Sequence, residues 1–300
     1  MAEKDFPPHF SEAPMKKLRI VFIVIFCAVL AFSLYKLGTE LNEQRKSRAA
    51  TDEALEIFGI APSTSRDAPA PVRTPKPSSP VHIEPGVDPN PELSYLVPDL
   101  PMDEPGRTLA DADLAAVQEV NPDVVGWIYL PDSPISYPLL QGTDNEYYLR
   151  HNWKRVRNDP ASIFLDYRAA GDFSDFDTIV YGHRMKSGSM FGTLKYFESD
   201  AEYLDTHPSF YIRVGDEVFR YDVFALVDAP LDDPIYEWEF TDDISSRGAY
   251  IAHTMSMDKL HTGIYPTPQN RIVTLVTCTG RSYTSRLVLQ LVLAGRLVDE

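Results

Sequence analysis

The chain has 300 residues, of which 44% are hydrophobic and 11% aromatic, so it can bury a substantial core. This length allows one or two domains. The formal net charge of -16 argues against nucleic acid or an anionic surface as a partner, because both require clustered lysine and arginine. Its two cysteines provide neither a disulfide framework nor the ligand spacing of a zinc site.

The first distinctive segment is an apolar run from Ile20 to Tyr35, interrupted only by Ser33. It is short for the roughly 20 residues that a membrane-spanning helix needs, but tilt and snorkelling of flanking lysine can cover the difference. Basic residues precede it, and no small-residue cleavage pattern closes it. We therefore predict a transmembrane signal anchor at 18–38, with residues 1–17 in the cytoplasm. A buried core helix is the alternative.

Two segments of different character follow the predicted anchor. Residues 39–60 are rich in helix formers and predict a juxtamembrane helix that continues the anchor. Residues 61–106 hold 12 of the 25 prolines and predict a semi-extended spacer, because such a segment cannot bury enough apolar surface to offset its ordering. The folded domain is then expected at 107–300, outside the cell.

Strand patterns dominate the predicted domain. A helix at Leu109–Val120 comes first, and helical spacing recurs at 188–197 and at 241–257, where Thr241 is the expected N-cap. The strands are expected at 124–130, 133–141, 161–168, 176–183, 209–229 with a hairpin turn at 215–217, 271–278 and 286–298. Many short strands with few helices predict a closed or nearly closed β-barrel.

Cys278 and Arg286 stand on either side of one short loop. Cys278 ends an apolar strand and Arg286 opens the next, so a hairpin would place them side by side at one rim. A neighbouring cation favours the nucleophilic thiolate, and a guanidinium can stabilise the oxyanion of a tetrahedral intermediate. A structural cysteine, buried and inert, is the alternative.

A nucleophilic cysteine needs a proton partner, which is usually a histidine. Of the seven histidines, His9 lies on the predicted cytoplasmic side and His82 in the predicted spacer. His183 directly follows an apolar strand and precedes a loop with glycine and serine, where a catalytic group can face solvent. A plain surface histidine is the alternative for this position.

The acidic stretch at 172–177 does not have the spacing of a calcium-binding loop. Asp172, Asp175 and Asp177 are better explained as a solvated acidic loop. No glycine-rich phosphate loop is present in the sequence. We therefore predict neither a metal nor another cofactor.

Taken together, four blocks of the chain resemble the class B sortases, which are membrane-anchored cysteine transpeptidases of Gram-positive bacteria. The family's Leu-x-Thr-Cys signature matches Leu275, Thr277 and Cys278. The other matching blocks, in the family's order, are 124–153, 161–168 and 181–197. The resemblance implies a mainly β fold. This is an eight-stranded barrel with an N-terminal helix and an extra helix, here 241–257, before the cysteine strand.

The resemblance also implies roles for individual residues. Cys278 would be the nucleophile, His183 the general acid/base, and Arg286 the residue that orients substrate and stabilises the oxyanion. The backbone N–H of Thr279 would be a second oxyanion donor. The implied substrate-binding residues are Asn145, Leu149 and Thr277. The chain departs from the family at Val276, where class B members usually have a small polar residue, and at Arg281, an additional arginine in the loop.

By this resemblance, the enzyme would cleave a C-terminal sorting signal similar to Asn-Pro-x-Thr-Asn after its threonine. The thioacyl-enzyme would then pass the secreted substrate protein to an amine of a peptidoglycan cross-bridge or a pilin. The expected location is the cell membrane, with a single N-terminal span. Another anchored cysteine peptidase, an L,D-transpeptidase-like enzyme or an inactive surface module are the alternatives.

Overall fold

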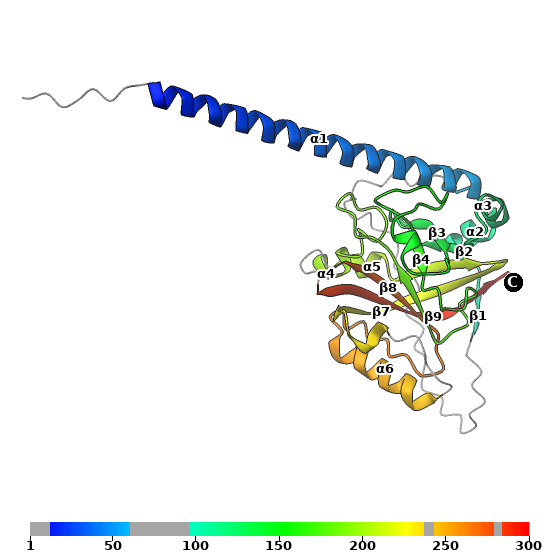
Figure 1. The fold of residues 1–300 in the computed structure, drawn as a ribbon. Coiled ribbons are helices and arrows are strands. Elements are labelled where there is room, and N and C mark those ends of the chain that lie inside the picture. Colours follow the sequence, from blue (N-terminus) through cyan, green and yellow to red (C-terminus); the bar gives the residue numbers. More distant parts are fainter. Residues whose placement is uncertain (1–12, 61–96, 237–242, 279–283, 300) are drawn as a thin grey trace, which may run out of the picture. The chain divides into compact units, whose positions relative to one another are not determined.

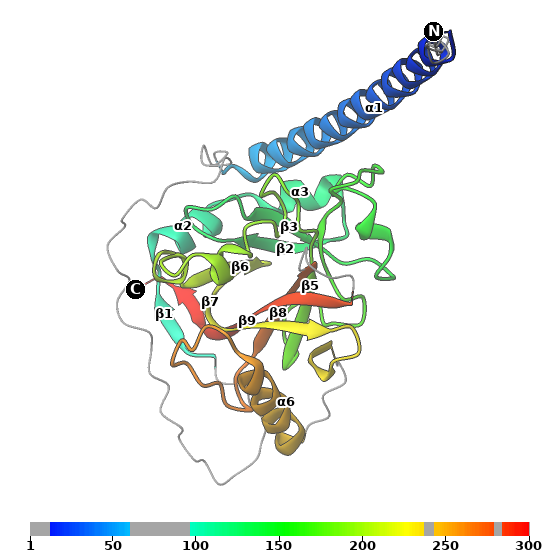
Figure 2. The same ribbon diagram turned by 90° about the vertical axis from the view of Figure 1, so that its left-hand side faces the viewer.

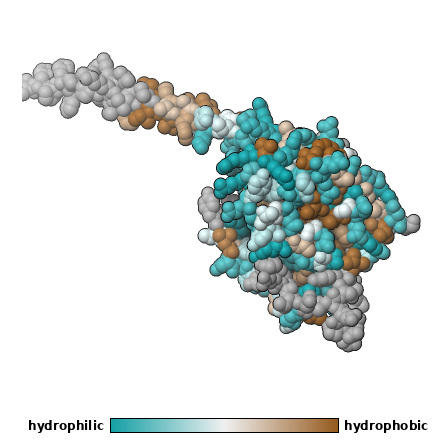
Figure 3. Space-filling view, turned by 45° about the vertical axis from the view of Figure 1, so that its right-hand side comes forward, coloured by the Kyte–Doolittle hydropathy of each residue, from teal (hydrophilic) through white to brown (hydrophobic). Residues whose placement is uncertain are grey.

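The computed structural model describes residues 13–60, 97–236, 243–278 and 284–299. The chain separates into two compact units, Met1–Lys46 and Ser47–Glu300. Helix α1 (Ala13–Phe58) contains the described part of the first unit (Figure 1). Apolar side chains such as Phe26 and Leu30 are exposed on it, and Figure 3 shows hydrophobic residues gathered along this helix. Within the described ranges, no helix combines the length and the apolar character needed to cross a membrane. The predicted transmembrane anchor at 18–38 is therefore not supported.

The second unit is built around a closed β-barrel. Its strands, within the described ranges, are β2 (Val124–Tyr129), β3 (Ser136–Leu140), β4 (Ile163–Leu165), β5 (Asp177–Tyr181), β6 (Ser209–Val214), β7 (Glu217–Pro230), β8 (Ile272–Cys278) and β9 (Ser285–Val298). They are ordered β9-β7-β6-β2-β3-β4-β5-β8, and β8 pairs again with β9 to close the ring (Figure 2). Strand β1 (Asp99–Pro101) adds in parallel to the end of β9. The predicted eight-stranded barrel is confirmed in this part of the chain.

Alternating side chains along β9 explain why this strand has an almost continuous apolar sequence. Leu287, Leu289 and Leu291 belong to the core inside the barrel, whereas Val288 and Val292 belong to a second cluster on the outer face. Successive side chains of a strand point to opposite faces, so both faces of β9 are buried.

Helix α6 (Ile244–Met257) supplies the cover for this outer face. Its buried residues Tyr250 and Ile251 pack in the same cluster as Val288 and Val292. The helix starts at Asp243, whose carboxylate accepts hydrogen bonds from the first-turn backbone, as an N-cap does. The extra helix expected before the cysteine strand is therefore confirmed, while the expected cap, Thr241, lies outside the described residues.

The last turns of α1 belong to the second unit. Phe58 stacks on Trp127 of β2, with ring centroids 3.9 Å apart and planes 8° from parallel, and both side chains are fully buried. The indole nitrogen of Trp153 donates to the carbonyl of Ala50 at 2.6 Å. The compact unit thus begins at Ser47 rather than at the expected Arg107.

Part of the segment expected as a spacer is also folded. Strand β1 and helix α2 (Glu104–Ala110) both lie within the predicted spacer range or across its end. Residues 61–96 lie outside the described residues. The folded unit is therefore longer at its N-terminal side than proline content alone indicated.

The helix predicted at Leu109–Val120 is wrong in detail, since α2 and α3 (Leu114–Val120) take its place. Asp113 caps the start of α3 through its side chain. Arg213 is buried and donates to the carbonyls at the end of α2, including that of Leu109 at 2.6 Å. The carbonyls at the end of a helix lack intrahelical partners of the regular kind, and the guanidinium supplies additional donors to them.

The helix predicted at 188–197 is also wrong. Only α4 (Tyr196–Ser199) and then α5 (Tyr203–Thr206) are helical here. Gly188 and Met190 have φ of 82° and 54°, and such left-handed residues interrupt an α-helix. The apolar residues that suggested helical spacing nevertheless enter the barrel core: Met190, Phe191, Leu194 and Phe197.

Candidate active site

The register of three neighbouring strands brings the predicted catalytic residues to one end of the barrel. β5 and β8 run parallel with Tyr181 opposite Val276, so His183 and Cys278 each follow this pair by two residues. β8 and β9 run antiparallel with Cys278 opposite Arg286. The predicted side-by-side placement of Cys278 and Arg286 is confirmed, and His183 lies at the same end.

The imidazole of His183 is half-buried and held by a single backbone group among the described residues. Its Nε2 lies 3.0 Å from the carbonyl oxygen of Leu149, in the 3-10 turn η1 (Tyr147–Leu149). A carbonyl can only accept, so Nε2 carries the proton in this arrangement. Nδ1 is left to exchange a proton with a reacting group. This contact could not be predicted from the sequence, because a backbone carbonyl is present at every residue and its residue type does not mark it.

Gly182 allows His183 to take this position. Its N–H continues the ladder by donating to the carbonyl of Val276 at 3.1 Å. A Cβ at this position would come within 2.5 Å of Ile163 Cδ1 and of Phe191 Cδ2. Only glycine fits between β8 and the buried ring of Phe191 without displacing them.

Arg286 is half-buried and lies within electrostatic range of a tyrosine that sequence reasoning missed. Burial raises the pKa of Tyr236, and the positive charge of Arg286 opposes that rise. The Tyr236 hydroxyl donates to the carbonyl of Ala229 at 3.2 Å, and Ala229 is the partner of Arg286 on β7. Tyr236 ends the short helix η2 (Pro234–Tyr236), which had no pattern of its own in the sequence.

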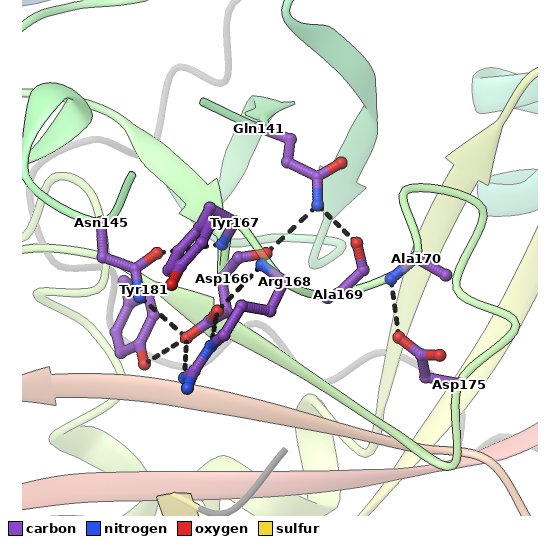
Figure 4. Close-up of polar contacts among 9 residues, drawn as sticks. All are labelled: Gln141, Asn145, Asp166, Tyr167, Arg168, Ala169, Ala170, Asp175 and Tyr181. Carbon is purple, nitrogen blue, oxygen red and sulfur yellow. Dashed lines mark hydrogen bonds and ion pairs between the residues drawn. The ribbon is translucent and has the colours of Figure 1, made fainter. Parts of the chain in front are cut away.

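The residues predicted to bind substrate have different surroundings. Leu149 is 39% exposed, so its side chain is available to a ligand. The side chain of Asn145 instead donates from Nδ2 to Asp166 at 2.8 Å and accepts from the backbone N–H of Tyr167 at 3.0 Å (Figure 4). Thr277 is buried, and its hydroxyl has no hydrogen-bond partner in the part of the chain that the structure describes. Val276 packs in the cluster under α6, and Thr279 and Arg281 lie outside the described residues.

The acidic stretch at 172–177 is only partly solvated. Asp172 is exposed, but Asp177 is buried at the start of β5, which corrects the prediction for this residue. Its carboxyl group accepts from the Tyr250 hydroxyl at 2.7 Å and from the Thr274 hydroxyl at 2.8 Å. Burial raises its pKa to about 7. Among the described residues, no group of histidine, cysteine, aspartate and glutamate side chains could hold a metal ion.

Comparison with known proteins agrees with this geometry. A family model described as a sortase domain matches residues 128–294. The chain belongs to the sortase family. Sortase B of Listeria monocytogenes is 30% identical over 287 residues, which cover 95% of this chain and 97% of that protein.

Solved class B sortases have the same fold. The structure of Bacillus anthracis sortase B has a TM-score of 0.62 and 26% identity, and the match covers 85% of this chain and all of that one. A substrate complex of Staphylococcus aureus sortase B has a TM-score of 0.56 and 26% identity, covering 60% of this chain and 84% of that one. The predicted enzyme class, a class B cysteine transpeptidase, is thereby confirmed.

Proposed function

We propose that this sortase cleaves a C-terminal sorting signal similar to Asn-Pro-x-Thr-Asn after its threonine. The threonine carbonyl is then passed from a thioacyl-enzyme to an amine of a peptidoglycan cross-bridge or a pilin. The catalytic unit works on the outer side of the cell, where secreted substrate proteins meet such amines. The Staphylococcus aureus relative has been solved as a substrate complex, which supports a substrate-binding site on this fold.

The observation that carries the proposal is the strand register around Cys278. Arg286 is its partner across the β8–β9 ladder, and His183 follows the parallel strand on the other side. A nucleophile between a cation and an imidazole is the arrangement that acyl transfer by a thiolate needs.

Proton transfers can be followed through both half-reactions. The Cys278 thiolate attacks the threonine carbonyl, and Arg286 and the backbone N–H of Thr279 stabilise the oxyanion. His183, protonated on both nitrogens, gives the Nδ1 proton to the leaving amine as the peptide bond breaks. In the second half-reaction, the acceptor amine attacks the thioester and loses a proton to His183 Nδ1. The product is a new amide bond, and the thiolate and imidazolium are regenerated.

Cys278→Ala tests the nucleophile. Cleavage of an Asn-Pro-x-Thr-Asn peptide, followed by mass spectrometry, should fall by at least a factor of about 10³, as removal of a nucleophile does in other acyl-transfer enzymes. Cys27→Ala is the matched control, because Cys27 is exposed and lies in the first unit. Retained cleavage in Cys278→Ala, with folding unchanged by circular dichroism, would sink the assignment.

Arg286→Ala tests the oxyanion role against the second arginine of the loop. It should lower kcat/KM about 10²–10³-fold, the loss typical of an oxyanion donor, and much more than Arg281→Ala. A larger loss of kcat/KM in Arg281→Ala than in Arg286→Ala would assign the oxyanion role to Arg281 instead.

An acceptor amine separates transpeptidation from simple peptide hydrolysis. Added to the wild-type reaction, the amine should shift the product from free acid to amide. A product that stays the free acid would favour a cysteine peptidase. A vinyl-sulfone derivative of the signal peptide should label Cys278 covalently, and failure to label it would favour an inactive surface module.

A further inference from the structure

Asp166 is a buried carboxylate next to the site that the proposed chemistry does not use. It directly follows β4 and is 1% exposed. Arg168 binds it with two parallel hydrogen bonds, Nε to Oδ1 and Nη2 to Oδ2, each 2.8 Å long. Oδ2 also accepts from Asn145 Nδ2 at 2.8 Å and from the Tyr181 hydroxyl at 3.1 Å (Figure 4).

Two of these donors belong to the two segments that position His183. Tyr181 ends β5 and stands two residues before His183 in the chain. Asn145 stands before the turn η1, whose Leu149 carbonyl accepts the hydrogen bond from His183 Nε2. The carboxylate of Asp166 therefore links the strand that carries the imidazole to the turn that orients it.

The turn itself is well held, so a displacement of Asn145 would be passed to Leu149. Asp144 Oδ1 accepts from the backbone N–H groups of Glu146 and Tyr147 at 2.8 and 2.7 Å. The N–H of Leu149 donates to the carbonyl of Glu146 at 3.2 Å. These contacts keep residues 144–149 together as a unit whose attachment to the barrel includes the hydrogen bonds of Asn145.

The carboxylate stays ionised in spite of its burial. Burial raises the pKa of Asp166, but hydrogen bonds from Arg168 and Asn145 outweigh it and hold the pKa below its usual value. An ionised carboxylate accepts at both oxygens and donates nothing, which matches the donors around it. An amide in its place would turn an N–H₂ group toward some of these donors and lose their hydrogen bonds.

We propose that Asp166 is a positioning residue for His183, holding the end of β5 and the Leu149 turn at the separation that the hydrogen bond from Nε2 to the Leu149 carbonyl requires. By this bond it fixes the tautomer of His183 and keeps Nδ1 directed to the reacting groups. The inference rests on the proposed acid/base role of His183. Displacements of about 1 Å in a catalytic group cost as much as 10²-fold in rate.

The test is Asp166→Asn in the full chain, with Asp175→Asn as the matched control. Asp175 lies in the same loop region, where its carboxylate accepts from the backbone N–H of Ala170 at 2.6 Å (Figure 4). Asp166→Asn should lower kcat for the signal peptide about 10–100-fold with little change in KM. Asp175→Asn should leave both constants within about twofold. Equal losses in the two variants, or a loss confined to KM, would overturn the proposal.

A spectroscopic measurement separates positioning from general damage to the fold. The ring nitrogens of His183, observed by ¹⁵N NMR in the Cys278→Ala background, should show the Nε2–H tautomer with Asp166 and a mixture of tautomers with Asp166→Asn. Unchanged nitrogen shifts would refute the inference. Tyr181→Phe keeps the ring and removes one donor, so it should produce a smaller change in the same direction if Asp166→Asn does not fold.

The two proposals fail in different ways. Cleavage by Cys278→Ala would refute the proposed function, whatever Asp166 does. A cleaving enzyme that depends on Cys278 but keeps its His183 tautomer in Asp166→Asn would leave the proposed function intact and refute the positioning role.

Discussion

Replacing Asp177 by asparagine should change how the stability of the protein depends on pH. Asp177 is buried at the start of β5 and has a pKa of about 7, raised mainly by burial. Unfolding returns the carboxyl group to a pKa of about 3.9. Between these two values the folded state binds more protons than the unfolded state, so the free energy of unfolding falls as pH rises.

The magnitude follows from the shift. A difference of about 3 pKa units corresponds to about 4 kcal/mol, fully present below pH 4 and lost by pH 8. Asparagine has the same shape and does not ionise. The side-chain amide of the asparagine can donate a hydrogen bond to the Tyr250 hydroxyl, and that hydroxyl then donates to the carbonyl of Ile235, 3.3 Å away. Relative to wild type, Asp177→Asn should therefore become more stable by about 4 kcal/mol between pH 4 and pH 8.

Urea unfolding of the full chain at several pH values measures this difference. The exposed Asp159 offers a matched control, since Asp159→Asn should follow the wild-type curve. Parallel loss of stability in wild type and Asp177→Asn from pH 4 to pH 8 would refute the reasoning. In that case Asp177 would have to be ionised in the fold throughout this range.

Two further predictions concern the edges of the catalytic unit. Phe58→Ala should lower the free energy of unfolding by about 3–5 kcal/mol, because it removes a fully buried stacked ring. The control Phe32→Ala, in the first unit, should change it by less than about 0.5 kcal/mol. A small effect of Phe58→Ala on urea unfolding would contradict the N-terminal boundary at Ser47. Gly182→Ala should lower the free energy of unfolding by about 1–3 kcal/mol and lower kcat, because the added Cβ would overlap Phe191. In the control Gly248→Ala, the added Cβ would lie at an ordinary distance of 3.8 Å from Pro268 Cγ, so stability should be unchanged or slightly higher. Full activity of Gly182→Ala would show that His183 tolerates the displacement.

Strands were predicted well because their signal is local and repeated. Along 271–278 and 286–298, apolar residues occupy both faces, and the structure buries one face in the barrel and the other under α6. The pairing of Cys278 with Arg286 could be predicted because a short loop between two strands leaves little choice of register.

Helix prediction failed at 188–197, where the apolar residues have helical spacing but the backbone conformation is not helical. Met190 and Phe191 have the separation of a helical face from Leu194 and Phe197, yet positive φ at Gly188 and Met190 breaks the helix. The same residues still reach the core, so hydrophobic spacing correctly identified burial and misidentified the element. A non-glycine residue with positive φ has no reliable signature in a single sequence.

Parts of the site that depend on distant pairs could not be predicted at all. Asp166 and Asn145 are 21 residues apart, and the stacked pair Phe58 and Trp127 comes from segments on opposite sides of a proline-rich stretch. The role of Asn145 in substrate binding stays a prediction from its place in a motif, and what the sequence could not indicate is that both ends of its amide are engaged by the protein. Tertiary contacts of this kind are set by the whole fold rather than by neighbouring residues.

The strand that carries His183 is short, and this explains why side chains matter to its position. β5 has five residues and pairs on one side with β4, which has three, whereas β7 and β9 are each 14 residues long. A short ladder offers few backbone hydrogen bonds to fix where the strand ends. Two carboxyl groups supplement it: Asp177 ties the start of β5 to β8 and α6, and Asp166 holds the hydroxyl of Tyr181 at its end. Because β8 carries Cys278, the proposed nucleophile, we expect these two links to influence how His183 meets it, and each should be detectable separately, one in the dependence of stability on pH and the other in kcat.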